Sequence, residues 1–105
     1  MNSAQRKYID FELANYQRNL QTLQEIDKHP QINSINWQYL RLITEGITVA
    51  LADLSPEQLE FVRLKYASNK HYDTSGLAYQ LHISERTVQR WTKEVFYQVA
   101  KYIGF

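Results

Sequence analysis

The chain has 105 residues, of which 44% are hydrophobic and 22% are charged, and its formal net charge is +1. This length fits one domain, or one domain with an interaction arm, and the hydrophobic content argues against wholesale disorder. The absence of cysteine excludes disulfides, thiolate nucleophiles and thiolate metal sites. Three glycines and two prolines leave little room for turns, so the composition predicts an all-α protein with long helices.

The sequence shows no membrane-spanning or signal segment, and its charges are nearly balanced. No apolar run approaches the roughly 20 residues needed to span a bilayer, and the N-terminal residues lead into a polar–apolar periodic segment instead of a signal core. We therefore expect a cytoplasmic protein with no membrane contact. Residues 1–54 carry five Lys/Arg and six Asp/Glu, whereas residues 55–105 carry seven and five. This asymmetry is too small to indicate a nucleic-acid partner by itself.

Two helices are predicted in the first half. A narrow apolar seam at 4-3-4-3 spacing indicates a helix over about 5–26 that packs against another helix, and it consists of Ile9, Leu13, Tyr16, Leu20 and Leu23. His29 precedes Pro30 and is pushed out of the α region, so residues 27–36 are expected to form a loop. A second helix is expected over 37–53, with an apolar stripe of Trp37, Leu40, Ile43, Ile47, Ala50 and Leu54.

The role of this N-terminal part, residues 1–53, stays open at this point. Gly46 lies inside the second helix and costs about 1 kcal/mol relative to alanine, so close packing must compensate there. The two helices could form an intramolecular hairpin, or an arm that makes a homodimer. In either case they would precede a second unit over residues 54–105.

The third helix has the clearest start signal in the chain. Ser55 is a suitable N-cap, Pro56 suits the first helical position, and Gln58 completes a capping box. Leu54 and Leu59 would flank the cap as a hydrophobic staple, and Leu59, Val62 and Tyr66 are expected to form the buried stripe. The polar run at 68–73 is expected to be a loop.

Residues 74–93 have the pattern of a helix-turn-helix, in which a short helix and a tight turn precede a second, steeply crossing helix. Ala78 is small where the two helices would come closest, and Ser84 would cap the second helix. His82 takes the turn position, where histidine tolerates the left-handed conformation. The apolar wedge between the helices would consist of Leu77, Leu81, Ile83, Val88 and Trp91.

If Val88, Trp91, Val95 and Val99 point inward, the opposite face of the last helix is suited to DNA. Arginine reads guanine, glutamine reads adenine, and glutamate can accept from cytosine; helix N-termini suit phosphates. The outward residues are Glu85, Arg86, Gln89, Arg90 and Lys93, with Ser84, Thr87 and Lys93 better placed for phosphates. Tyr72, in the loop before the helix-turn-helix, is a candidate contact to the DNA backbone. Most other aromatic residues recur at the helical spacing of core positions.

These residues resemble a known family. The segments LSPE at 54–57, EFVRLKY at 60–66, LA at 77–78, LHISERT at 81–87 and AKYIGF at 100–105 resemble RinA/ArpU-type phage transcriptional regulators. The C-terminal half of that family is similar to region 4 of bacterial sigma factors. The resemblance implies a three-helix, sigma region 4-like helix-turn-helix unit in a bacterial host cell, activation of late packaging or lysis genes, and base reading by Arg86, Gln89 and Arg90. Double-stranded DNA would be the partner, with bacterial RNA polymerase or a homodimer supplying further affinity.

Two other functions are compatible with a helix-turn-helix or helical chain of this size. A small-terminase-like DNA-packaging protein also combines a helix-turn-helix with helices for oligomerisation, and a helical protein-interaction module would not bind DNA. His29, His71 and His82 lie in expected loops or turns without ligand spacing, so we expect no metal site. No nucleophile–base set and no glycine-rich phosphate loop is present, so no enzyme activity, cofactor or small-molecule substrate is expected.

Overall fold

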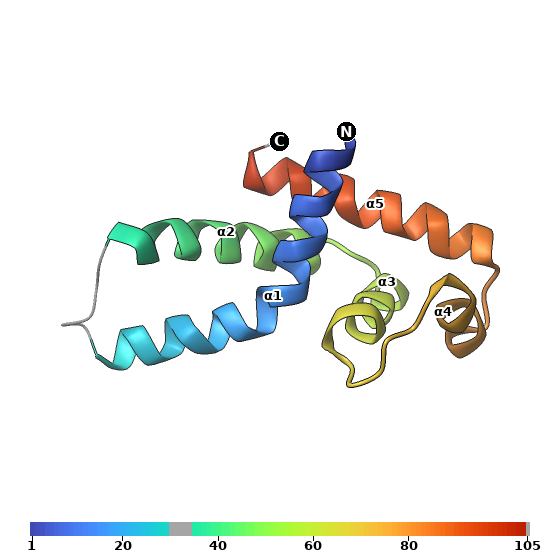
Figure 1. Ribbon diagram of the computed structural model, residues 1–105, viewed down its shortest axis with the longest axis horizontal. Helices are drawn as coiled ribbons and strands as arrows, with labels where there is room; N and C mark the ends of the chain where they lie inside the picture. Colours follow the sequence, from blue (N-terminus) through green and yellow to red (C-terminus); the bar gives the residue numbers. More distant parts are fainter. Residues whose placement is uncertain (30–34, 105) are drawn as a thin grey trace.

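The structure is a computed structural model that describes residues 1–29 and 35–104, and all regular structure in this part of the chain is helical. The elements are α1 (Ser3–Lys28), α2 (Ile35–Ala52), α3 (Pro56–Val62), the π-helical turn η2 (Arg63–Ala67), α4 (Thr74–Leu81) and α5 (Glu85–Ile103). Figure 1 shows α1 and α2 side by side at one end, α3 and α4 at the other, and α5 spanning both. The prediction of an all-α fold is confirmed.

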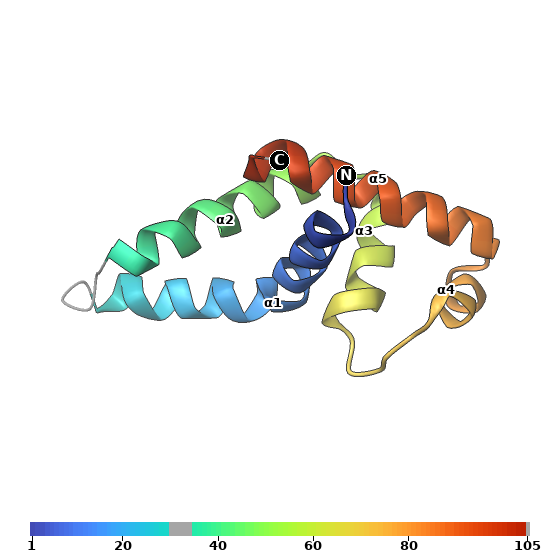
Figure 2. The same cartoon turned by 45° about the horizontal axis from the view of Figure 1, so that its top comes forward.

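α1 is longer than the sequence pattern predicted, because a capping box sets its start. The Asn2 side chain accepts a hydrogen bond from the Gln5 backbone N–H at 2.8 Å, and the Gln5 side chain accepts from the Asn2 N–H at 2.9 Å. The helix ends at Lys28, and His29 is its C-cap, so the loop expected over 27–36 is shorter; its residues 30–34 lie outside the described part. Figures 1 and 2 show that α1 bends in its middle, so that its first half crosses towards α5.

α2 packs closely on the last turns of α5 at Gly46. A Cβ added to Gly46 would lie 2.7 Å from the Tyr102 carbonyl oxygen and 3.0 Å from Ile103 Cγ2. The compensation expected for a glycine inside this helix is therefore a close approach between two backbones. α2 also buries its predicted stripe around Ile43, Ile47 and Ala50.

α3 begins as predicted, and its predicted buried stripe is confirmed at Val62 but not at Leu59. Ser55 and Gln58 form the predicted capping box, in which the Ser55 hydroxyl accepts from the Gln58 N–H at 3.2 Å. Leu59 was predicted to be buried and is 40% exposed, whereas Phe61 is 1% exposed. The prediction was wrong for Leu59 because the ring of Phe61 fills the space against Trp91, with ring centroids 6.0 Å apart. This packing rotates Leu59 outwards and leaves Val62 buried.

α4 and α5 are joined by a tight connection in which His82 takes the predicted turn position. The Asp73 side chain caps α4 by accepting from the Gly76 N–H at 2.7 Å. At the other end His82 is left-handed, with φ 57° and ψ 43°. Its N–H bonds the Tyr79 carbonyl at 3.4 Å and the Ile83 N–H bonds the Ala78 carbonyl at 3.1 Å, which is the hydrogen-bond pattern of a Schellman motif.

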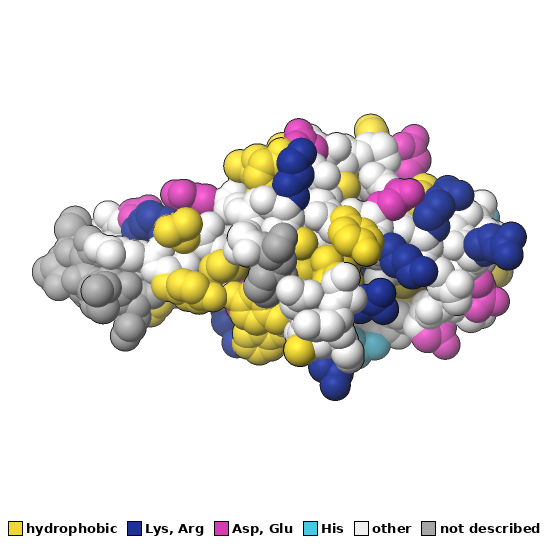
Figure 3. Space-filling view, turned by 90° about the horizontal axis from the view of Figure 1, so that it is seen from above, with side chains coloured by type: hydrophobic (Ala, Val, Ile, Leu, Met, Phe, Trp, Pro, Cys, Tyr) yellow, Lys and Arg dark blue, Asp and Glu magenta, His cyan; other side chains and the backbone are white. Residues whose placement is uncertain are grey.

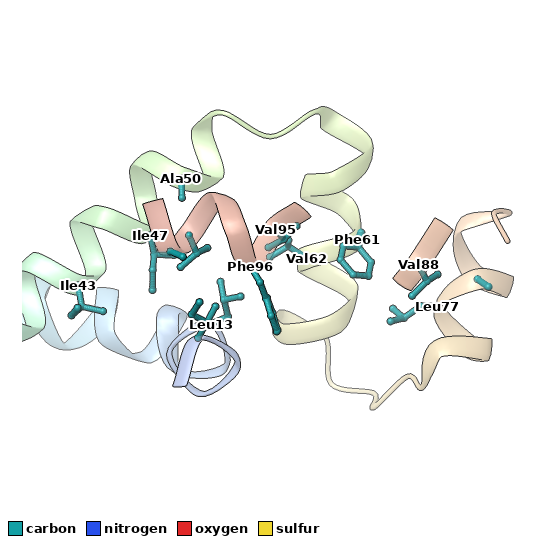
Figure 4. Packing of buried hydrophobic residues seen from close by; sticks show 14 residues of the cluster. Leu13, Ile43, Ile47, Ala50, Phe61, Val62, Leu77, Val88, Val95 and Phe96 are labelled. Atoms are coloured by element: carbon teal, nitrogen blue, oxygen red, sulfur yellow. The ribbon is translucent and has the colours of Figure 1, made fainter. Parts of the chain in front are cut away.

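One hydrophobic core joins all these helices. In Figure 4, Leu13 and Ile47 lie on one side of Val95 and Phe96, while Phe61, Leu77 and Val88 lie together on the other. The apolar residues predicted to lie between α4 and α5 all belong to this core or pack against it: Leu77, Ala78, Leu81, Ile83, Val88 and Trp91. The core runs through both halves of the chain, and the functional division at residue 54 stays a prediction. Within the described residues, no helix has the length and apolar character needed to cross a membrane.

Candidate nucleic-acid interface

The first three turns of α5 have one buried face and one exposed face. Val88 and Val95 are 2% and 1% exposed, and Trp91 packs partly buried against the core. The side chains predicted to point outward are all exposed, namely Glu85, Arg86, Gln89, Arg90 and Lys93. Because an α-helix has 3.6 residues per turn, positions 86, 89, 90 and 93 share one face. We refer to Arg86, Gln89, Arg90 and Lys93 as the α5 face.

The start of α5 is fixed by two hydroxyl side chains. The Ser84 hydroxyl accepts from the Thr87 backbone N–H at 3.0 Å, so Ser84 is the N-cap, as predicted. The two hydroxyl oxygens are also 2.9 Å apart, and one of them donates to the other. Because each hydroxyl has one donor, this pair leaves one O–H available to an approaching acceptor. Ser84 is exposed and Thr87 is half-buried.

Arg90 is engaged within the protein, whereas Arg86 is not. Arg90 Nε lies 3.7 Å from Glu94 Oε1, and Glu94 Oε2 accepts from the Gln58 side-chain amide at 2.6 Å. No ion pair holds Arg86 or Lys93 within the part of the chain that the structure describes. The i,i+4 spacing of Arg90 and Glu94 could have been read from the sequence. The contribution of Gln58 could not, because it comes from α3.

Tyr72 lies in the loop directly before α4 and is not part of α5. It is half-buried and packs against the core, and its ring lies 3.3 Å from the position that a Cβ on Gly76 would occupy. The ring therefore supports the start of α4. Contact between its hydroxyl and a DNA backbone stays a prediction.

The basic side chains of the molecule are unevenly distributed. Figure 3 shows several Lys and Arg side chains over the half of the molecule that contains the first turns of α5, with Asp and Glu side chains beside them. The three histidines are separate: His29 caps α1, His71 lies between η2 and α4, and His82 lies in the turn. Among residues 1–29 and 35–104, no group of three or more His, Asp or Glu side chains is arranged to hold a metal ion.

Comparisons with protein families, curated proteins and solved structures found no match to this chain. The resemblance to phage regulators therefore stays a hypothesis that depends on the sequence segments themselves. The geometry adds an independent observation, which is a row of exposed Arg and Gln side chains at the start of a helix whose opposite face is buried.

Proposed function

We propose that the protein is a sequence-specific DNA-binding transcriptional regulator in which α4 and α5 form a helix-turn-helix and α5 enters the major groove. The observation that carries the proposal is the α5 face. Its side chains are exposed at the N-terminal end of a helix that a Schellman turn and a serine cap hold against α4. Helix-turn-helix proteins contact base edges with the N-terminal residues of such a helix.

The roles of the individual side chains follow from their chemistry. Arg86 and Arg90 can each pair with guanine O6 and N7, and Gln89 can pair with adenine N6 and N7. Glu85, in the first turn, can accept from cytosine N4. Lys93 and the free hydroxyl of the Ser84–Thr87 pair suit phosphate oxygens, as do the first backbone N–H groups of α5.

Glu94 would hold Arg90 in a fixed direction before DNA arrives. An exposed ion pair of this kind is worth at most about 1 kcal/mol, so Arg90 can leave Glu94 for a guanine without a large penalty. The hydrogen bond that Glu94 accepts from the Gln58 side-chain amide keeps the carboxylate beside α3. Arg86 has no such restraint, and we expect it to lose more side-chain entropy on binding.

The class of regulator and its target genes are inferred from the resemblance to phage regulators. We infer an arrangement similar to sigma region 4 and a role in activating late phage genes. With a net charge of +1 the protein has little general attraction for DNA, so a homodimer or RNA polymerase would supply the remaining affinity. A two-fold dimer would recognise palindromic half-sites about one helical turn apart.

The test is selection of bound duplexes from a random DNA library, followed by gel shift on the selected sequence. Arg86→Ala combined with Arg90→Ala is expected to abolish the preference for that sequence. Arg18→Ala combined with Lys28→Ala, which removes the same charge from the α1–α2 end, should retain the preference. Failure of the wild-type protein to bind any duplex at low salt would contradict the proposal and favour a protein-interaction module.

A further inference from the structure

A hollow of about 260 Å³ lies beside the α5 face. Its basic lining comes from three parts of the chain: Arg6 from α1, Lys65 from η2, and Lys93 from α5. Thr74, Gln89 and Phe96 also line it. We refer to it as the basic hollow. The bend of α1 brings Arg6 to this place, because the first half of that helix crosses towards α5 (Figures 1 and 2).

The basic hollow has no acidic side chain in its lining. In the described part of the chain, Arg6, Lys65 and Lys93 form no ion pair; Lys65 only lies over the Tyr66 ring, 5.5 Å from its centre. Cations that share a hollow without a counter-charge produce a positive local potential, which favours an anion as its occupant.

The positions of these cations are held by the fold. The Tyr66 hydroxyl donates to Asp10 Oδ1 at 2.6 Å, which ties η2 to α1 and keeps Lys65 beside the helix that carries Arg6. The backbone positions of Lys93 and Gln89 are set by α5, whose opposite face is buried. Asp10 does not line the hollow, and within the described residues it forms no ion pair with these cations.

Size and position indicate the chemistry of the occupant. Pockets for drug-sized ligands usually measure about 300–1,000 Å³, so the hollow suits a small anionic group. Gln89 and Lys93 belong both to its lining and to the α5 face. A DNA strand whose bases reach Gln89 would therefore bring its own phosphates towards Arg6 and Lys65.

We infer that the basic hollow binds the phosphodiester backbone of the DNA strand beside the groove that α5 enters, with Arg6 and Lys65 as phosphate contacts supplied by α1 and η2. This inference rests on the proposed function and extends it. It gives the N-terminal helix a direct part in DNA binding, through a pair of residues that lie 59 positions apart in the chain.

The test uses the full chain and the selected duplex, with binding followed by fluorescence anisotropy from about 50 to 200 mM salt. Each phosphate contact contributes about 0.9 to the slope of log K against log salt. Arg6→Gln combined with Lys65→Gln should lower that slope by about two, with no change in the preferred sequence. The matched control is Lys7→Gln combined with Arg18→Gln, which removes two exposed α1 charges that do not line the hollow. Thermal unfolding checks that all variants fold.

The outcomes separate the inference from the proposed function. If the hollow variant and the control variant have the same slope, the inference is overturned while sequence-specific binding stands. If the wild-type protein binds no duplex, both are overturned. A titration with inorganic phosphate, followed by amide chemical shifts, tests the other source of this anion. Saturable shifts at Arg6 and Lys93, together with an unchanged slope for the hollow variant, would assign the hollow to free phosphate and contradict a backbone contact.

Discussion

The carbonyl oxygen of Tyr102 packs against the α-carbon of Gly46. A Cβ atom at position 46 would lie only 2.7 Å from this oxygen. Real Cβ atoms essentially never approach a backbone oxygen so closely, and a backbone cannot move aside as a flexible side chain can. The last turns of α5 can therefore pack on α2 only because residue 46 has no side chain.

Gly46→Ala is expected to destabilise the protein, although alanine is the better helix former. The gain in helix propensity is about 1 kcal/mol, whereas overpacking typically costs about 1–3 kcal/mol and here requires α5 to shift. We expect a lower urea midpoint in unfolding followed by circular dichroism. Gln38→Ala, on the exposed side of the same helix, should change stability by less than about 0.5 kcal/mol. A more stable Gly46→Ala variant would contradict the close approach.

Two threonines one helical turn apart in α2 should respond oppositely to valine. Thr44 is 2% exposed, and its hydroxyl has no hydrogen-bond partner in the described residues. Thr48 donates to the Thr44 carbonyl at 2.9 Å and bonds the Tyr16 hydroxyl at 2.6 Å. Thr44→Val should stabilise the protein by about 1 kcal/mol, because it removes an unsatisfied buried hydroxyl. Thr48→Val should destabilise it by about as much. Equal effects in urea unfolding would refute this assignment.

Because Glu12 is buried, we expect the protein to lose stability as the pH rises. It is only 8% exposed, and burial raises its pKa above the ordinary 4.5. The folded state therefore holds this proton more tightly than the unfolded state does. Its contribution to stability is fully present below about pH 4.5 and is lost as pH rises through the folded-state pKa. Glu12→Gln should thus be more stable than the wild type at neutral pH, with the advantage shrinking towards pH 4. Glu45→Gln, at an exposed position, is the control; the same profile in both variants would contradict the prediction.

His82→Gly should raise stability. The left-handed conformation costs an L-residue roughly 1–2 kcal/mol, and glycine avoids this cost while losing about 0.5–1 kcal/mol through greater freedom in the unfolded chain. The expected net gain is a few tenths to about 1 kcal/mol. His71→Gly is the matched control, because in the described residues only His82 combines a side chain with a positive φ. Thermal unfolding should show the control unchanged or less stable.

Single substitutions on the α5 face separate base reading from phosphate contact. Arg90→Ala should cost about 1–3 kcal/mol on the selected duplex and relax specificity at one base position. Lys93→Ala should weaken binding to all duplexes alike and lower the salt slope by about one. The comparison uses binding constants for the selected duplex and for each single-base variant of it. Losses that do not depend on sequence in both proteins would rule out base reading by Arg90.

The features that the sequence predicted correctly are those with local causes. Ser55, Ser84 and the left-handed His82 each act within a few residues of their own position, so their patterns could be read directly. The exposed and buried faces of α5 follow from periodicity for the same reason. The start of α1 was missed because Asn2 and Gln5 form a capping box ahead of the first apolar residue.

The other features that were missed depend on contacts between distant segments. Phe61 displaces Leu59 from the interior because Trp91 lies opposite it, which periodicity within α3 does not reveal. The basic hollow requires a bend in α1 and a π-helical turn before Arg6 and Lys65 can meet Lys93. No local pattern indicates either feature.

The length of α5 has a mechanical consequence. This helix has 19 residues and is therefore about 28 Å long, with Gly46 of α2 packed against its last turns and the arginines at its beginning. One continuous helix thus connects the α1–α2 pair to the arginines at the start of α5, without a hinge between them. A partner bound to the α1–α2 pair would therefore fix the orientation of the start of α5. Two chains that dimerise through their α1–α2 pairs would hold the starts of their α5 helices at a fixed distance.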